Sequence, residues 1–204
     1  IIVGMKKEYS VEVATLTDQM NVKWADSGLS LKNGRRMMTN DSPLKLEEGI
    51  VKFRYDDGVE ILVEGPAKFS LGRSDLFLEY GRIYSWVSKS GVGFSVQTPT
   101  SKFVDLGTEF AVQADLNGSA ELHVVKGKVQ LFAKLNDGSK TSQLVTENKA
   151  VRYDANRGTV QNIAVEKEIF VRTINSSSSS VWRGQEHLSL PDIIAGGDGF
   201  GTGD

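Results

Sequence analysis

Asp105 and Glu109 are the residues of this sequence best suited to chemistry, because two carboxylates on one strand can act as a general acid and a general base. Residues four apart in a strand share a face. At about 3.3 Å per residue, their Cα atoms would lie about 13 Å apart, beyond the roughly 5–9.5 Å between the acid pairs of glycosidases. The spacing therefore favours another arrangement, with Asp105 hydrogen-bonded to backbone at a turn and Glu109 in solvent.

The two histidines, His123 and His187, lie 64 positions apart and share no spacing with a third metal ligand or a nucleophile. We interpret them as ordinary surface or half-buried residues. Residues 198–204 resemble a calcium-binding turn, but such turns come in arrays, so a linker is the better interpretation. Gly91 and Gly93 lack the third glycine of a phosphate-binding loop. We therefore predict no catalytic residue, no metal and no cofactor.

Three aromatic residues, Tyr80, Tyr84 and Trp86, have the same parity in a predicted strand. They could form a stacking platform for a sugar or a surface for a protein partner. Gly81 could bulge the strand and shift that parity. A core or cross-strand role is the favoured alternative.

The composition describes a globular chain with no strong charge. Of its 204 residues, 39% are apolar and 25% are charged, with a net charge of -2. These values exclude a disordered chain and a strongly basic nucleic-acid binder. The absence of cysteine excludes disulfides and thiolate metal sites, and no stretch approaches the roughly 20 apolar residues of a membrane span. We expect one main domain.

A short repeat sets the expected architecture. Between residues 31 and 127, an aliphatic residue stands three positions before a glycine six times. The first four of these glycines are 15, 16 and 16 residues apart, and the six are Gly34, Gly49, Gly65, Gly81, Gly107 and Gly127. A unit of about 16 residues fits two short strands and their turns. The sequence therefore predicts an all-β fold of stacked short antiparallel hairpins, forming a rolled β-sandwich or a β-helix-like body, with at most one short helix.

Turn residues locate the hairpins. Asp57 with Gly58 predicts one hairpin over residues 50–63, and two further turns are predicted at Asn117 with Gly118 and at Asp137 with Gly138. Another hairpin is predicted over residues 150–163.

The domain boundaries follow from these elements. We expect an N-terminal strand segment at 1–28 that leads from a membrane anchor, a β domain at 29–165, and a C-terminal part at 166–204. The first residues could be the trimmed end of a membrane helix or signal segment, or simply a first strand. The C-terminal part should hold a short helix over 164–173, a serine-rich linker over 175–180 and a glycine-rich tail.

Residues 94–112 and 121–131 resemble the FecR family. The matching positions are Thr98, Pro99, Asp105, Leu106, Gly107, Thr108, Glu109, Phe110, Val112, Gly127 and Val129. Residues 63–69 and 76–81 also resemble the part of the family sequence that precedes this motif. In all, the resemblance covers roughly residues 29–133. The wording of the motif is most similar to planctomycete-type versions, which are often fused to carbohydrate-binding modules.

The resemblance implies a periplasmic all-β sensor region of an anti-sigma regulator anchored to the inner membrane. In such proteins a cytoplasmic part, absent from this chain, holds a sigma factor, one helix crosses the membrane, and the periplasmic part receives a signal from an outer-membrane receptor. The shared residues are best explained as scaffold. Gly107 and Gly127 would supply corners with positive φ, Thr108 a local hydrogen bond, and Phe110 and Val112 core packing.

The favoured function is a non-enzymatic signalling module that relays an envelope signal by protein–protein contacts, through edge-strand pairing or a flat β face. Its partners would be an envelope or outer-membrane receptor and, through the missing part, a sigma factor. Membrane contact would occur only through the missing anchor. The alternative is an exported cell-surface binding or spacer module, with a glycan as a possible ligand. An envelope hydrolase is disfavoured because no acid and base pair was found.

Overall fold

The computed structural model describes residues 10–41, 43–135, 137–175 and 180–182. The first residues of the chain, His187 and the glycine-rich tail at 198–204 lie outside these ranges, as does most of the serine-rich stretch. The regular secondary structure of the described part is β-strand apart from a single short 3₁₀ turn, η1 (Lys89–Gly91). The prediction of an all-β protein is therefore confirmed.

Thirteen strands form one sheet, and two more form a separate pair. The strands are β1 (Glu12–Trp24), β2 (Arg36–Met38), β3 (Leu44–Tyr55), β4 (Glu60–Leu71), β5 (Asp75–Trp86), β6 (Ser95–Gln97), β7 (Ser101–Asp105), β8 (Glu109–Ala114), β9 (Ala120–Lys126), β10 (Lys128–Lys134), β11 (Lys140–Thr146), β12 (Lys149–Asp154), β13 (Thr159–Ile163), β14 (Thr173–Asn175) and β15 (Ser180–Trp182).

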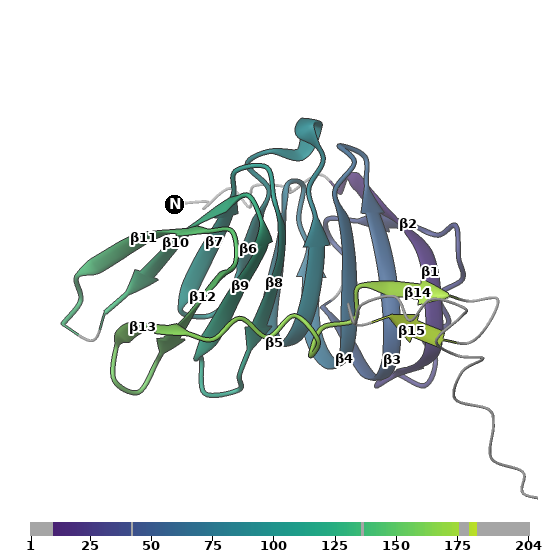
Figure 1. Ribbon diagram of the computed structural model, residues 1–204. Coiled ribbons are helices and arrows are strands. Elements are labelled where there is room, and N and C mark those ends of the chain that lie inside the picture. Colours follow the sequence, from purple (N-terminus) through teal and green to yellow (C-terminus); the bar gives the residue numbers. More distant parts are fainter. Residues whose placement is uncertain (1–9, 42, 136, 176–179, 183–204) are drawn as a thin grey trace, which may run out of the picture.

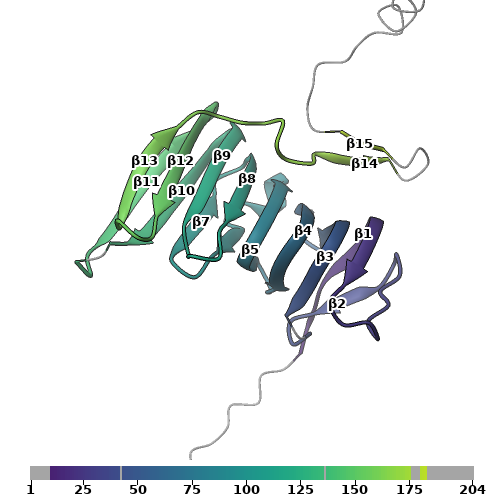
Figure 2. The same cartoon turned by 90° about the horizontal axis from the view of Figure 1, so that it is seen from below.

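The sheet forks at β5. Strands β2, β1, β3, β4 and β5 run in that order, and β5 then pairs with two different strands. Its first residues pair with β6, which continues through β7 and β10 to β11, and its last six residues pair with β8, which continues through β9 and β12 to β13. Figure 2 shows the β8, β9, β12 and β13 branch above the β7, β10 and β11 branch. The core lies between the two branches.

Of the two predicted forms, this arrangement is that of the rolled sandwich. Every pairing in the sheet is antiparallel except the short contact of β5 with β6, whereas the coils of a β-helix pair in parallel. Among the described residues the sheet does not close into a barrel, because β2, β11 and β13 each pair on one side only.

The glycine repeat marks a line of bends across the long strands. Gly49 in β3 has φ +90, and a Cβ there would lie 2.3 Å from the carbonyl oxygen of Asn21 in β1. Gly81 in β5 has φ +119, and its Cβ would lie 2.5 Å from the Cβ of Ala67 in β4. The strand registers shift at these points. The 16-residue period therefore brings the bends of neighbouring strands together, where only glycine allows the close approach.

The four predicted hairpins form as β3–β4, β8–β9, β10–β11 and β12–β13. At the first turn Gly58 has φ +86, and the carboxylate of Asp57 accepts a hydrogen bond from the Val59 N–H at 3.2 Å. Such local hydrogen bonding is why Asp–Gly pairs close tight turns. β1, which lies in the range expected as a separate leading segment, pairs along most of its length with β3.

The short helix predicted over 164–173 is wrong. Residues 164–172 instead form neither helix nor strand, and run as a strap with a turn at 168–169 along one outer face of the sheet, before β14 (Figure 1). Phe170 and Val171 are adjacent and both buried. Packing of this apolar pair on the sheet outweighs the weak helical periodicity of so short a segment.

Candidate functional site

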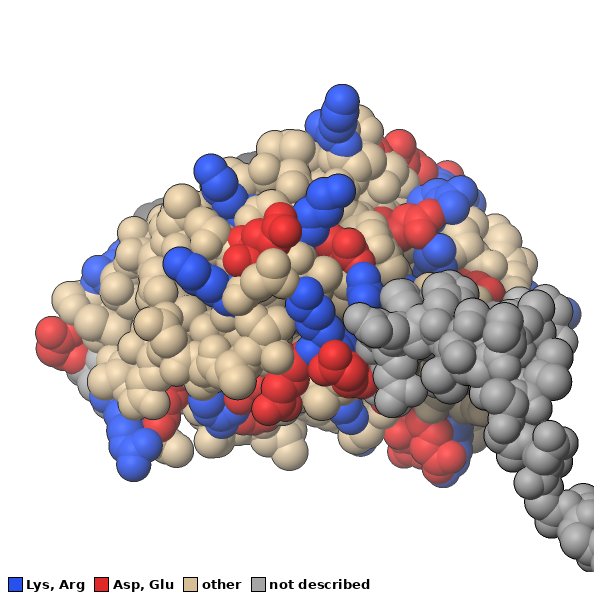
Figure 3. Space-filling view, in the orientation of Figure 1, with Lys and Arg blue, Asp and Glu red and all other residues tan. Residues whose placement is uncertain are grey.

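A second apolar cluster lies outside the sandwich, between the sheet and the strap (residues 164–172). It joins residues of β3, β4, β5 and β8 to two strap residues: Ile50, Leu62, Tyr84, Ala111, Phe170 and Val171. An uncovered apolar patch on a sheet face is a common binding surface. Figure 3 shows Lys and Arg side chains interleaved with Asp and Glu on this side of the molecule. The strap therefore covers an apolar surface within a mixed-charge face.

A carboxylate clasp fastens the C-terminal end of the strap. The Tyr84 hydroxyl donates to Glu109 Oε1 at 2.5 Å, and Arg172 Nη2 donates to the same oxygen at 2.6 Å. The side chains of Arg172 and Glu109 are only 15% and 18% exposed. The Arg172 guanidinium also lies 5.3 Å from the centre of the Tyr84 ring, within the range of a cation–π contact.

The contacts of the clasp determine the protonation states of Glu109 and Tyr84. Burial acts to raise the pKa of Glu109, but the hydrogen bonds from Tyr84 and Arg172 and the arginine charge outweigh it, so the pKa is lowered. Burial, followed by the interaction with Glu109, raises the pKa of Tyr84. Glu109 is therefore ionised and Tyr84 neutral at physiological pH. A carboxylate committed in this way is a poor general acid or base.

His123 holds the other end of the strap. It is 1% exposed, and its Nδ1 accepts a hydrogen bond from the Glu166 N–H at 3.2 Å. Its Nε2 lies 3.3 Å from Glu121 Oε2, and its ring centre lies 5.1 Å from that of Phe170. Since Nδ1 accepts, the proton of the neutral ring is on Nε2 and points to Glu121. The sequence interpretation of His123 as a surface or half-buried residue missed this contact.

Glu121 is itself held by two donors. The hydrogen bond with His123 is the largest influence that lowers the pKa of Glu121, and Arg152 lowers it further against the effect of burial. Arg152 also donates to Asp115 at 2.7 Å. Each end of the strap is therefore linked to a carboxylate of the sheet, directly to Glu109 through Arg172 and indirectly to Glu121 through His123.

Asp105 has the turn role expected from its sequence. It is completely buried at the end of β7 and accepts hydrogen bonds from the Gly107 N–H, at 2.7 Å, and from the Thr108 hydroxyl. Burial raises the pKa of Asp105, and its hydrogen bonds with Gly107 and Thr108 oppose that rise. Glu109 begins the next strand, β8, so the two carboxylates do not share a strand. The expectation that Glu109 points to solvent was wrong, because its side chain is only 18% exposed.

Gly107 and Gly127 form the corners that the motif suggested. Their φ angles are +94 and +84, and a Cβ on Gly127 would lie 2.4 Å from the carbonyl oxygen of Gly107. Phe110, Val112 and Val129 are fully buried in the core. These motif residues therefore build the scaffold.

The rest of the motif shapes the turn before β7. Thr98 accepts a hydrogen bond on its hydroxyl from the Ser101 N–H at 3.0 Å, and Pro99 lies within this turn. Not every motif residue is buried: Leu106 is 49% exposed, and Pro99 and Gly107 are exposed as well.

The three aromatic residues do not form one open platform. Tyr84 is 1% exposed and lies 4.7 Å, ring centre to ring centre, from the half-buried Trp86. Tyr80 lies beyond the bend at Gly81, opposite Lys68 on β4. A role of these residues in partner binding stays a prediction.

The sequence analysis missed the functional residues of the strap. The strap residues Phe170 and Arg172 lie more than 60 positions from Glu109, so only the fold brings them together. The available signal was the apolar run at 169–171 followed by an arginine.

In the described ranges, no group of three or more His, Asp or Glu side chains could hold a metal ion. No helix in this part of the chain is long and apolar enough to span a bilayer.

Comparisons with known proteins agree with the sequence motif. Residues 46–130 match the family model FecR, described as FecR protein. A crystal structure at 1.65 Å of a putative anti-sigma factor from Parabacteroides distasonis ATCC 8503 has a TM-score of 0.54 at 15% identity, over 68% of this chain and 71% of that one. A second such structure, at 2.50 Å from the same organism, has a TM-score of 0.42 at 14% identity, over 84% and 71%.

No curated protein matches this chain significantly. The first structural likeness shows a shared fold, and the family match covers the motif residues from Thr98 to Val129 together with β3, β4 and β5. Residues 46–130 of this chain are therefore similar to the FecR family.

Proposed function

We propose that this chain is the periplasmic sensor region of a FecR-like anti-sigma regulator, and that it relays an envelope signal through protein–protein contacts without catalysis. The observation that carries the proposal is the FecR match over residues 46–130, which contains the complete motif. In the full-length protein the region would be anchored to the inner membrane. The sigma factor would be held by a part outside this chain, and the signal would come from an envelope or outer-membrane receptor.

The strap is the element best suited to relay a signal. Three hydrogen bonds that join it to the sheet involve side chains: Glu166 to His123, Arg82 to the Ile169 carbonyl at 3.2 Å, and Arg172 to Glu109. An element without ladder pairing belongs to the less stable parts of a structure. A receptor that bound the apolar cluster would release the strap and change the position of whatever follows it.

The geometry also supports a non-enzymatic role. The two carboxylates with the best spacing for chemistry have structural tasks, Asp105 in the turn between β7 and β8 and Glu109 in the clasp. The buried His123 binds strap backbone through Nδ1 and faces Glu121 through Nε2. Each candidate for acid–base work is therefore already occupied by a neighbour in the fold.

A transcription assay tests this proposal. The full-length protein would be expressed in its host with a reporter of the sigma-dependent promoter, and a tagged copy would be used to recover the sigma factor. Arg172→Ala should change reporter output, because it removes one fastening of the strap. Arg157→Ala is the matched control, since Arg157 is 74% exposed and pairs only locally with Asp154.

Two results would overturn the proposal. One is a reporter that responds to neither Arg172→Ala nor deletion of the whole protein, with no sigma factor recovered. The other is a cleaved signal peptide with no cytoplasmic part, found with topology fusions. That second result would favour the alternative, an exported binding or spacer module.

A further inference from the structure

The free edge of β11 is the longest regular edge of the sheet. β11 pairs with β10 in an unbroken register of seven residue pairs, and none of the described residues pairs with its other side. The edges formed by β2, with three residues, and β13, with five, are shorter, and the part of β1 beyond β2 is interrupted by shifts in its register with β3. An unpaired strand edge is a template for another strand unless it is short, bulged or covered. Within the described ranges β11 is neither short nor bulged nor covered, and its remaining protection is charge, since Lys140 on β11 stands opposite Lys134.

The hydrogen-bond pattern identifies which groups face the free edge. The Leu135 N–H donates to the Ser139 carbonyl at 2.8 Å, which makes that pair a hydrogen-bonded one. Pairs alternate along an antiparallel ladder, so residues 141, 143 and 145 turn their backbone groups to β10. The backbone groups of Ser142 and Leu144 therefore point to the free edge.

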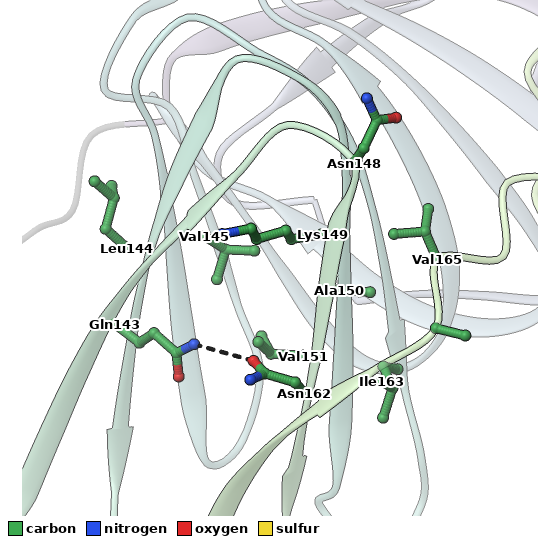
Figure 4. Close-up of a pocket in the computed structure, with 11 residues that line it drawn as sticks. Gln143, Leu144, Val145, Asn148, Lys149, Ala150, Val151, Asn162, Ile163 and Val165 are labelled. Carbon is green, nitrogen blue, oxygen red and sulfur yellow. Dashed lines mark hydrogen bonds between the residues drawn. The ribbon is translucent and has the colours of Figure 1, made fainter.

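A groove lies along the inner side of this edge. It has a volume of about 500 Å³ and is lined by β11, β12, β13 and the start of the strap. Figure 4 shows Val145, Lys149 and Val151 in this groove and the hydrogen bond from Gln143 to Asn162 across it, at 3.4 Å. A strand added to β11 would direct every second side chain into this space.

The outer side of the same edge is basic and partly apolar. The outward-facing residues of β7, β10 and β11 include four lysines and two exposed apolar residues: Lys102, Lys128, Lys134, Lys140, Phe132 at 45% exposed and Leu144 at 47% exposed. Lys134 and Lys140 stand directly opposite each other, a pairing that destabilises a sheet. In the described part of the chain, none of these lysines forms an ion pair. The face carries unbalanced positive charge in a chain whose net charge is -2.

The turns at the two ends of β11 each carry a carboxylate. Asp137 accepts hydrogen bonds from the N–H and hydroxyl of Ser139, and Glu147 accepts from the Gly127 N–H at 3.4 Å. They do not neutralise the lysines between them.

We propose that β11 is a docking edge for an extended, acidic segment of another protein, which adds to the sheet as a further strand. Main-chain hydrogen bonds to β11 would hold the segment, and acidic side chains on one face would lie beside Lys134 and Lys140. Apolar side chains on that face would cover Leu144 and Phe132, and the alternate side chains would enter the groove beside Val145. Binding of this kind uses pairing for affinity and alternate side chains for specificity.

Charge favours an acidic partner over a second copy of this chain. Two β11 edges could pair with each other, but each would bring its own lysines to the contact, and like charges across strands are unfavourable. The proposal goes beyond sensor function, because it holds whether or not the protein controls a sigma factor.

Peptide binding to the purified chain tests the proposal. The probes are a labelled eight-residue peptide of alternating Glu and Val, its counterpart of alternating Lys and Val, and the acidic peptide with a central proline. Only the first should bind, with weaker affinity at high salt, and the amide NMR signals that shift should be those of β11 and β10. Binding should weaken at least tenfold in Ser142→Pro, which removes one edge N–H.

Charge reversal provides the second arm. The double variant Lys134→Glu with Lys140→Glu should lose the acidic peptide and gain the basic one, while Lys89→Glu, on the exposed η1 turn, should bind as the wild type does. Unchanged melting temperatures would show that the variants fold. Equal binding of all peptides, or no shift on β11, overturns the proposal. Shifts on β10 and β11 caused only by an oligomer of a uronic acid would identify an anionic glycan instead, and self-association abolished by Ser142→Pro would identify a second copy.

Discussion

The two motif corners should differ sharply in their tolerance of alanine. Both Gly107 and Gly127 have positive φ, which costs an L-residue about 1–3 kcal/mol. At Gly107 the nearest atom to an added Cβ is a methyl of Val92 at 3.8 Å, an ordinary contact. At Gly127 it is the Gly107 carbonyl oxygen at 2.4 Å, so backbone must move, at a further cost of about 1–3 kcal/mol. We expect losses of about 2 kcal/mol for Gly107→Ala and about 4 kcal/mol for Gly127→Ala.

Urea unfolding followed by tryptophan fluorescence measures both losses, and an unchanged slope of free energy against urea confirms that the unfolded states are comparable. A domain of this size should still fold with a loss of about 4 kcal/mol. Gly93→Ala is a useful control, because Gly93 has φ +97 and nothing lies within 4 Å of its added Cβ. Equal losses at Gly107 and Gly127 would refute the close contact between the two turns. No loss at either would refute the positive φ.

Three further predictions concern the buried charges. Arg172→Ala should weaken the docking of the strap on the sheet by about 2–4 kcal/mol, since it leaves the Glu109 carboxylate without its cation. Faster amide exchange at 169–171, absent in Arg157→Ala, would show this. The pKa of Glu109 is lowered in the fold, so the contribution of the clasp should be complete above the ordinary glutamate pKa and should be lost as the pH falls through the lowered value. Protection factors at 169–171, corrected for the intrinsic pH dependence of amide exchange, that stay constant from pH 6 to 3 would contradict this. The pKa of Asp105 is raised, so the stability advantage of wild type over Asp105→Asn should shrink as the pH rises above the ordinary aspartate pKa, and paired melting curves would expose a constant or growing advantage.

Much of the sheet could be predicted from local sequence. The turns form where Asp57 with Gly58 and Asn117 with Gly118 supply side-chain acceptors and positive φ, which are properties of two adjacent residues. The period of the glycines predicted stacked short units, and Gly49 and Gly81 do bring bends of neighbouring strands together. The role of Asp105 was also predictable, because its partners, Gly107 and Thr108, are close in sequence.

The candidate site was not predictable in the same way. The clasp joins β5, β8 and the strap, and its members become neighbours only because β5 forks between two branches. Nothing local distinguishes Glu109 in this clasp from a glutamate in solvent. The strap was mistaken for a helix because Val165, Ile169 and Phe170 have helical spacing, whereas Phe170 and Val171, next to each other, are the pair that is buried. Tertiary burial therefore overrode a weak local pattern.

The strap, not the sheet, is the part of this molecule that a partner could move at low cost. Moving any central strand would break backbone pairing along its length and the close glycine contacts at its bend. Releasing the strap would break a few side-chain hydrogen bonds and uncover Phe170 and Val171. Inverting a two-state population needs a preference of about 5.5 kcal/mol for one state, which is within reach of one interface. The groove beside β11 reaches Val165 at the start of the strap, so a segment bound there would contact the same movable element that the clasp fastens at its other end.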